Sequence, residues 1–223
     1  MRQYPPSGPV FDIGGGNGFV AKGMQDAGLD VVLLEPGVNG AKNAQRRGIR
    51  SVICAALEDV GFLRGSLPAV GLFDVVEHIR DDRHLLAKLR DLLSPGGRAY
   101  ITVPAYNALW SQEDIDAGHQ RRYSRLGLAN LLSNTGFSVN FLTGFFQFLP
   151  LPIFAARVIP YRLGLARAAD ASEASSQMKQ QHVLSNGTAS HILGWLQRRE
   201  VARIRARKGT YYGASWLAVA TNT

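Results

Sequence analysis

The chain has 223 residues, of which 46% are hydrophobic and 19% charged, and its formal net charge is +8 at pH 7. This length and apolar content fit one globular domain with a decoration and supply ample material for a hydrophobic core. The single cysteine, Cys54, excludes an intrachain disulfide framework and suits a reducing compartment, so we expect a cytoplasmic protein.

The first predicted element is a short apolar strand at residues 10–13, which runs into a glycine-rich turn. Glycines allow a tight turn and a close approach of the backbone to a ligand. A helix at 19–27 and a second strand at 30–35 follow, and this strand ends on Glu35. An acid there can accept hydrogen bonds from both ribose hydroxyls, so the segment predicts a nucleotide-binding strand–turn–helix. The turn carries, in order, Asp12, Gly14, Gly15, Gly16 and Gly18.

The spacing of the glycines indicates which nucleotide is bound. A dinucleotide fingerprint, G-x-G-x-x-G, sets a pyrophosphate at the helix N-terminus. Here the spacing is G-x-G-x-G, and Asp12 precedes the first glycine. A carboxylate in that position repels a pyrophosphate but suits a ligand that carries an ammonium group. The motif therefore favours S-adenosylmethionine and disfavours a nicotinamide-dependent oxidoreductase.

Strands and helices alternate through the middle of the chain. Each expected strand is a short apolar run, which suits a parallel sheet that is buried on both faces. We expect Cys54, which falls in one of these runs, to be a buried structural thiol. The expected elements are a helix at 38–47, strands at 51–55, 70–74 and 99–103, and a helix at 82–93.

Two further motifs follow in order. Residues 72–79 read L-F-D-V-V-E-H-I, and residues 94–98 read S-P-G-G-R. Together with the glycine turn, they resemble the motifs of the class I S-adenosylmethionine-dependent methyltransferases, in particular the bacterial type 11/type 12 group. The resemblance covers residues 10–141 and returns at 213–220. It implies an α/β fold with a Rossmann-like seven-stranded sheet in the order 3-2-1-4-5-7-6, strand seven antiparallel, and helices on both faces.

The resemblance also implies how S-adenosylmethionine, and its product S-adenosylhomocysteine, are bound. Asp12 anchors the methionine ammonium, and Glu35 takes the ribose hydroxyls in a bidentate pair. The glycines of the turn shape the pocket beside the methionine and ribose. The adenine contact is expected near Ala56 and Leu57, and Asp74 at the end of strand four completes the predicted cofactor-binding set.

Methyl transfer from a sulfonium is an in-line displacement, so positioning and desolvation supply most of the acceleration. A general base helps when the acceptor is a hydroxyl. His78 follows strand four, and His119 lies in a polar loop after strand five, at the sheet edge where ligands bind. We predict both as catalytic, against the alternative that each only hydrogen-bonds loop backbone.

A metal site at the same edge is an alternative. Asp74, Glu77 and His78 can approach one another after strand four, as in some quinone-modifying relatives that use magnesium. Magnesium prefers oxygen ligands and keeps several waters, so the histidine argues against an obligatory site. We therefore predict no bound metal.

The C-terminal part predicts a helix ending near residue 134 and closing hairpin strands at 137–142 and 215–220. Residues 1–142 and 213–223 then form the methyltransferase core, and 143–212 an insertion too long for a hairpin loop. The insertion begins with an apolar segment, continues as an Ala/Ser/Gln-rich flexible link at 166–187, and ends in a basic helical stretch at 189–208. It is either a substrate lid or a packed decoration.

Two features concern the ends of the chain and the membrane. Only nine residues precede strand one, whereas most relatives carry a helix or two there, so either the chain is truncated or the pocket lacks this cover. No apolar stretch of a secretory signal begins the chain. The longest apolar run, 145–159, contains Pro150, Pro152 and Arg157, so we expect no membrane span.

The positive charge raises the alternative of a nucleic-acid methyltransferase. A basic footprint is necessary for phosphate binding but does not identify it, and no RNA-binding module or Asn/Asp-Pro-Pro-Tyr signature is present, so nucleic acid is disfavoured. We predict methyl transfer, at oxygen, to a small or lipid-like and possibly anionic acceptor. A cofactor-binding module or an inactive methyltransferase-like protein is the other alternative, and the oligomeric state stays open.

Overall fold

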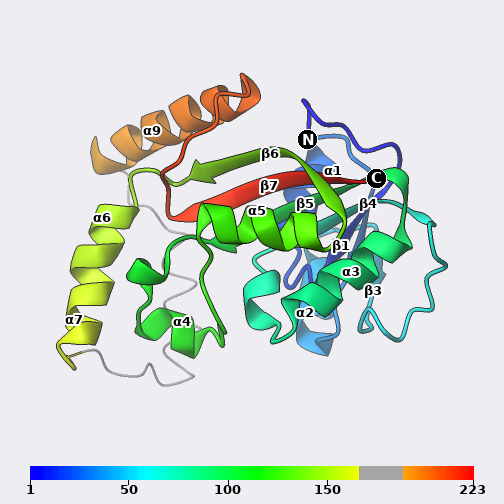
Figure 1. The fold of residues 1–223 in the computed structure, drawn as a ribbon, viewed down its shortest axis with the longest axis horizontal. Coiled ribbons are helices and arrows are strands. Elements are labelled where there is room, and N and C mark those ends of the chain that lie inside the picture. The colour runs from blue at the N-terminus through cyan, green and yellow to red at the C-terminus, as the bar shows by residue number, and fades with distance from the viewer. Residues whose placement is uncertain (166–187) are drawn as a thin grey trace.

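The computed structural model describes residues 1–165 and 188–223 (Figure 1). The Ala/Ser/Gln-rich segment 166–187, predicted to be a flexible link, lies outside the described residues. Within the described part, no helix is long and apolar enough to cross a membrane.

A seven-stranded sheet forms the centre of the molecule, in the order β3-β2-β1-β4-β5-β7-β6. Neighbouring strands run parallel except β7, which is antiparallel to both β5 and β6. The predicted topology is therefore confirmed. The strands are β1 (Val10–Ile13), β2 (Val31–Leu34), β3 (Ser51–Ile53), β4 (Leu67–Phe73), β5 (Leu93–Pro104), β6 (Phe137–Phe145) and β7 (Ser215–Asn222).

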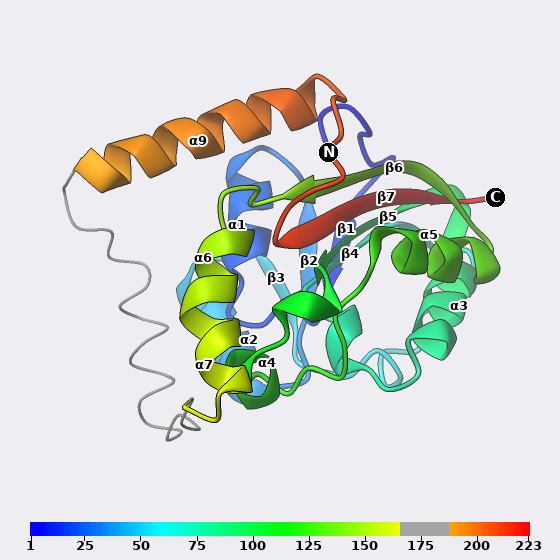
Figure 2. The same cartoon turned by 60° about the vertical axis from the view of Figure 1, so that its left-hand side comes forward.

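Helices connect and cover the strands (Figures 1 and 2). Those of the N-terminal two thirds are α1 (Phe19–Asp26), α2 (Val38–Arg46), the 3-10 turn η1 (Val76–His78), α3 (Asp82–Leu92), the 3-10 turn η2 (Asn107–Leu109), α4 (Gln112–Asp116) and α5 (Arg125–Asn134). Between β6 and β7 lie α6 (Pro150–Ile153), the π-helical turn η3 (Phe154–Val158), α7 (Ile159–Arg162) and α9 (Thr188–Arg205).

Local sequence explains where the helices begin. Ser124 caps α5 by accepting a hydrogen bond from the backbone of Gly127 at 2.9 Å, as a serine before a helix should. Asp81 caps α3 in the same way, through the backbone of His84. The leucines of α3 recur at helical spacing, and Leu86 and Leu89 are fully buried.

The sheet is buried on both faces because its side chains alternate between two hydrophobic clusters. Val70 and Leu72 of β4 join the cluster that contains the leucines of α3 and α5. Ala69 of β4 joins the second cluster, which contains Val10, Leu33 and residues of α1. This double burial accounts for the continuous apolar runs in the sequence.

Two expectations about local structure were wrong. Cys54 is exposed, because the edge strand β3 ends at Ile53 and the thiol falls in the loop that follows. β5 begins at Leu93 and not at residue 99, since Leu93 already pairs with Leu67 of β4 before the register shifts. The S-P-G-G-R segment is thus an irregular part of this strand and not a turn that precedes it.

Candidate active site

The carboxyl ends of β1, β2, β4 and β5 meet at one edge of the sheet, where ligands bind in open α/β folds. The glycine turn between β1 and α1 lies at this edge. Gly14 and Gly16 have φ values of 70° and 53°, a left-handed conformation that suits glycine. A Cβ on Gly14 would come within 3.1 Å of Val75, whereas one on Gly16 would meet no atom within 4 Å. The turn therefore packs against the protein at Gly14 and faces open space at Gly16.

The other two glycines of the turn, Gly15 and Gly18, lie close to neighbouring side chains. A Cβ on Gly15 would approach Asp12 Oδ2 to 2.9 Å, so this glycine lies directly against the buried carboxyl. Gly18 is the N-cap of α1, also in a left-handed conformation. Both residues let the backbone pass close to neighbouring side chains.

Asp12 is a buried acid with an unsatisfied carboxyl oxygen among the described residues. Its side chain is 1% exposed, and within the described residues its Oδ2 has no hydrogen-bond partner. Burial, and then the charge of Glu35, raise the pKa of Asp12 to about 7. A buried carboxylate is costly unless a charged donor satisfies it. The ammonium group of an amino-acid moiety fits that requirement.

Glu35 is oriented by the backbone around it. Its Oε2 accepts a hydrogen bond from Gly16 N at 2.9 Å, and its Oε1 accepts one from Gly37 N at 2.8 Å. Each carboxylate oxygen retains a further lone pair for a ligand. Glu35 therefore fixes the glycine turn as well as offering acceptors at the end of β2.

A mainly apolar cavity of about 290 Å³ opens beside the turn, between the ends of β2 and β3 and the start of α3. Ala56 and Leu57, the predicted adenine contacts, both line it, together with Glu58, Pro36 and Val75. An apolar slot with few polar groups suits a flat heteroaromatic ring.

Asp74 closes β4 in a strained conformation. Its φ is 56°, which is uncommon for a residue other than glycine, and strain of this kind gathers at functional sites. Thr102 Oγ1 donates to its Oδ1 at 3.1 Å and accepts from its backbone nitrogen. The residue is otherwise exposed.

The two predicted histidines come together although 41 positions separate them in the sequence. Gln120 N donates to Glu77 O at 2.7 Å, which ties the loop after α4 to η1. The rings of His78 and His119 are 4.8 Å apart, centroid to centroid, in an edge-to-face arrangement. Partial burial and the neighbouring His119 lower the pKa of His78, whereas a hydrogen bond with the Gly118 backbone opposes that shift.

Asp114, which the sequence analysis missed, orients His119. Its Oδ1 lies 2.8 Å from His119 Nδ1 and accepts from Arg122 Nε at 2.7 Å. Burial acts to raise the pKa of Asp114, but these two hydrogen bonds hold it below its usual range. Asp114 also forms a capping box with Ser111 at the start of α4. The Ser-x-x-Asp pattern at 111–114, typical of a capping box, could have indicated from the sequence that Asp114 lies in the first turn of a helix in this loop.

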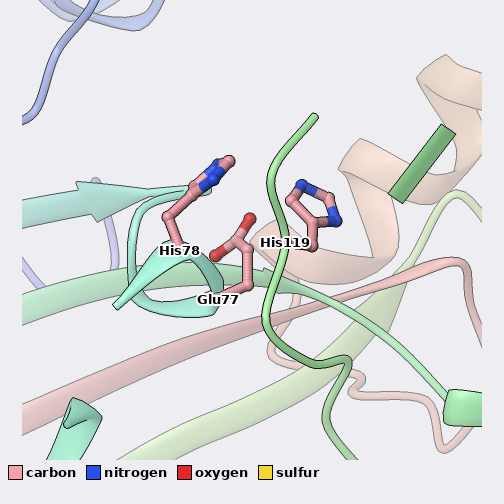
Figure 3. A group of neighbouring side chains, drawn as sticks. All are labelled: Glu77, His78 and His119. Carbon is pink, nitrogen blue, oxygen red and sulfur yellow. The ribbon is translucent and has the colours of Figure 1, made fainter. Parts of the chain in front are cut away.

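The Glu77 carboxyl lies beside both rings (Figure 3), and the residue is fully buried. Within the described residues neither carboxyl oxygen has a hydrogen-bond partner. Burial, and then the charge of Asp74, raise the pKa of Glu77 to about 8, so the carboxyl is mostly neutral at pH 7.

The structure brings Glu77 and His78 together with His119, and the charge of Asp74 also reaches these three residues. The candidate ligand atoms of these three residues lie within 4.8 Å of one another. A cation here would have to displace the proton of Glu77 and to accept two nitrogen ligands, which magnesium does not favour.

Comparison with known proteins adds to this geometry. The family profile described as "Methyltransferase domain" matches residues 3–140. The ubiquinone biosynthesis O-methyltransferase of Chromobacterium violaceum is 28% identical over 105 residues, which cover 44% of this chain and 45% of the relative. The chain spans less than half the length of the curated relatives it matches.

Two solved structures share the fold. A SAM-dependent methyltransferase from Archaeoglobus fulgidus is 17% identical with a TM-score of 0.61, over 99% of this chain and 89% of that one. A putative methyltransferase from Bacillus halodurans is also 17% identical with a TM-score of 0.61, over 100% and 96%. At this identity the likeness shows the fold alone.

Glu77→Gln tests the buried neutral carboxyl. The folded-state pKa of about 8 lies above the ordinary value of 4.5. The stability that the protonated group contributes is therefore fully present below pH 4.5 and is lost as pH rises through 8. Glutamine stays neutral at every pH, so the variant does not lose this stability. We therefore expect the free energy of unfolding of the variant minus that of wild type to increase by about 2–4 kcal/mol between pH 5 and pH 9.

Urea unfolding at several pH values measures this difference. Glu58→Gln is the matched control, because Glu58 is exposed and its pKa is lowered. Parallel pH profiles for wild type and Glu77→Gln would show that Glu77 is not held neutral.

Proposed function

Because the chain belongs to the class I S-adenosylmethionine-dependent methyltransferases of the type 11/type 12 group, we propose that it methylates an oxygen of a small or lipid-like acceptor. The observation that carries this proposal is the Asp114–His119 pair at the carboxyl edge of the sheet. A carboxylate-oriented imidazole is the arrangement of a general base for a hydroxyl group. The O-methyltransferase named among the relatives supports oxygen as the acceptor atom.

The residues around the glycine turn suit the cofactor. We assign the methionine ammonium to Asp12, the ribose hydroxyls to Glu35 and the adenine to the cavity lined by Ala56 and Leu57. Asp74 completes the proposed cofactor site, and it interacts electrostatically with both histidines. When bound, the cofactor supplies a methyl group on a cationic sulfur.

His119 acts as the base in this proposal. Asp114 holds Nδ1, so Nε2 is the nitrogen that receives the proton of the acceptor hydroxyl as the oxygen–methyl bond forms. Arg122 keeps Asp114 charged and thereby stabilises the imidazolium that results. The buried, neutral Glu77 and the exposed His78 lie next to this base.

The segments between β6 and β7 form the proposed lid over the acceptor. Arg157 Nε lies 3.2 Å from Glu113 Oε1, and Arg162 donates to Ala108 O at 3.3 Å. These contacts tie η3 and α7 to α4 and η2, which adjoin the proposed base. A packed decoration without a role in catalysis is the alternative.

The raised pKa of Asp12 predicts that cofactor binding depends on pH. Only the ionised carboxyl pairs with an ammonium group, so affinity increases as pH rises through about 7. We expect S-adenosylhomocysteine to bind about 10-fold more tightly at pH 8 than at pH 6. Calorimetry measures this, and Asp12→Asn should bind more weakly and lose the pH dependence. Retention of the same dependence in Asp12→Asn would assign it to another group.

Glu35→Ala tests the ribose site. We expect S-adenosylhomocysteine binding to weaken by about 1.5–3 kcal/mol, the range for hydrogen bonds to a charged group. Asp30→Ala is the matched control, since Asp30 is an exposed acid just before the opposite end of β2. Unchanged calorimetric affinity in Glu35→Ala would remove this residue from the pocket.

His119→Ala tests the proposed base. Turnover should fall by about 10²–10⁴-fold, the usual contribution of general acid–base catalysis, while affinity for S-adenosylhomocysteine stays constant. Transfer of labelled methyl from S-adenosylmethionine to a small-molecule and lipid extract measures turnover. His78→Ala should cost less. Equal turnover in wild type and His119→Ala would refute the assignment.

A further inference from the structure

The helical segment formed by α6, η3 and α7 exposes much apolar surface. It packs against the protein mainly through Pro150 and Val158, which are buried. Contiguous exposed apolar surface marks an interaction site, whereas single exposed apolar residues are ordinary. The exposed large side chains of this segment and the residues just after it are Leu151 (75% exposed), Phe154 (38%), Ile159 (42%), Leu163 (66%) and Leu165 (71%).

The neighbouring helix α9 adds a basic and aromatic surface. Its exposed residues include Arg198, Arg199, Arg203 and Arg205. Trp195 is 51% exposed, and the Arg199 guanidinium lies 5.3 Å from its ring. A tryptophan beside an arginine is a pair that suits the boundary between lipid and water.

Both surfaces belong to one end of the molecule. Buried Glu200 on α9 accepts a hydrogen bond from Gln147 N at 3.0 Å, three residues before α6 begins. Figures 1 and 2 show α6, α7 and α9 together at the end opposite α3. We call the exposed side chains of residues 150–165 and of α9 the α6–α9 face.

We propose that the α6–α9 face docks on the surface of an anionic lipid bilayer. Apolar side chains beside arginines and a tryptophan are the composition of helices that lie in the membrane interface. The net charge of +8 complements anionic headgroups. It opposes the pairing of two copies through this face, since both copies would bring like charges together.

The position of this face links docking to the reaction. The same contacts that tie η3 and α7 to α4 and η2 join the docking surface to Asp114, which orients His119. A lipid-like acceptor in the bilayer would therefore lie beside the proposed base. This step rests on the proposed function, whereas the docking itself does not.

Cosedimentation of the full chain with vesicles tests the docking. We expect binding to vesicles of phosphatidylglycerol and phosphatidylcholine in equal parts, weaker binding to phosphatidylcholine alone, and a loss of binding as salt rises. Leu151→Gln, Phe154→Gln and Leu163→Gln combined should lower the partition coefficient at least about 10-fold, because the apolar contact with lipid is removed.

The charge contribution is measured with a second variant. Arg198→Gln with Arg203→Gln should weaken binding on the order of 5-fold per residue on the anionic vesicles and hardly at all on the neutral ones. The matched controls are Leu63→Gln and Arg64→Gln, whose side chains are highly exposed in the loop between β3 and β4. Both controls should bind like wild type, and circular dichroism checks that every variant is folded.

Three outcomes would overturn the docking: no vesicle binding by wild type, equal binding by the triple apolar variant, or a dimer in vesicle-free solution that the triple variant abolishes. The last would assign the face to a second copy. A wild-type protein that does not bind vesicles but transfers methyl normally to a water-soluble acceptor would refute the docking alone. Vesicle binding without any methyl transfer would instead refute the proposed function.

Discussion

Parallel pairing of β1 between β2 and β4 is the constraint on which the rest of the structure depends. The register pairs Ile13 with Leu34, and Asp12 with Gly71, so the segments after these strands leave the sheet at the same edge. Gly14 N and Gly15 N then donate to Leu34 O, which fixes the glycine turn against the end of β2. The turn, Glu35 and the loop after β4 are neighbours for this reason.

Three buried acids at this edge have different environments and therefore suit different tasks. Within the described residues, Asp12 Oδ2 and both carboxyl oxygens of Glu77 lack hydrogen-bond partners, and burial raises the pKa of each residue. Asp114 is as buried as Asp12, but hydrogen bonds from Arg122 and His119 keep its pKa low. The first two carboxyls therefore suit a cation or a proton in the proposed site, whereas Asp114 remains charged beside an imidazole.

The apolar side chains fall into a buried group and an exposed group. Those of the sheet and of α3 are buried in two clusters that hold the carboxyl edge in register. Those of α6, η3 and α7 remain largely exposed beside the basic residues of α9. The contacts of Arg157 and Arg162 with the α4 region connect this outer surface with the proposed active site at the carboxyl edge of the sheet. The proposed chemistry and the proposed docking thus share one end of the molecule.

The sequence by itself determined the strands and the first turn, because apolar runs predict buried parallel strands and the glycine spacing predicts the turn. The strand order, which the structure confirms, followed from the resemblance of the ordered motifs to a known family. The sequence also indicated the glycine turn and Glu35. Only the tertiary structure decided that Cys54 is exposed in the loop after an edge strand and that Asp114 lies against His119. It also decided that Glu77 is buried with no hydrogen-bond partner for its carboxyl oxygens among the described residues. These properties depend on which loops meet and on how much water each group loses, and neither is encoded in neighbouring residues.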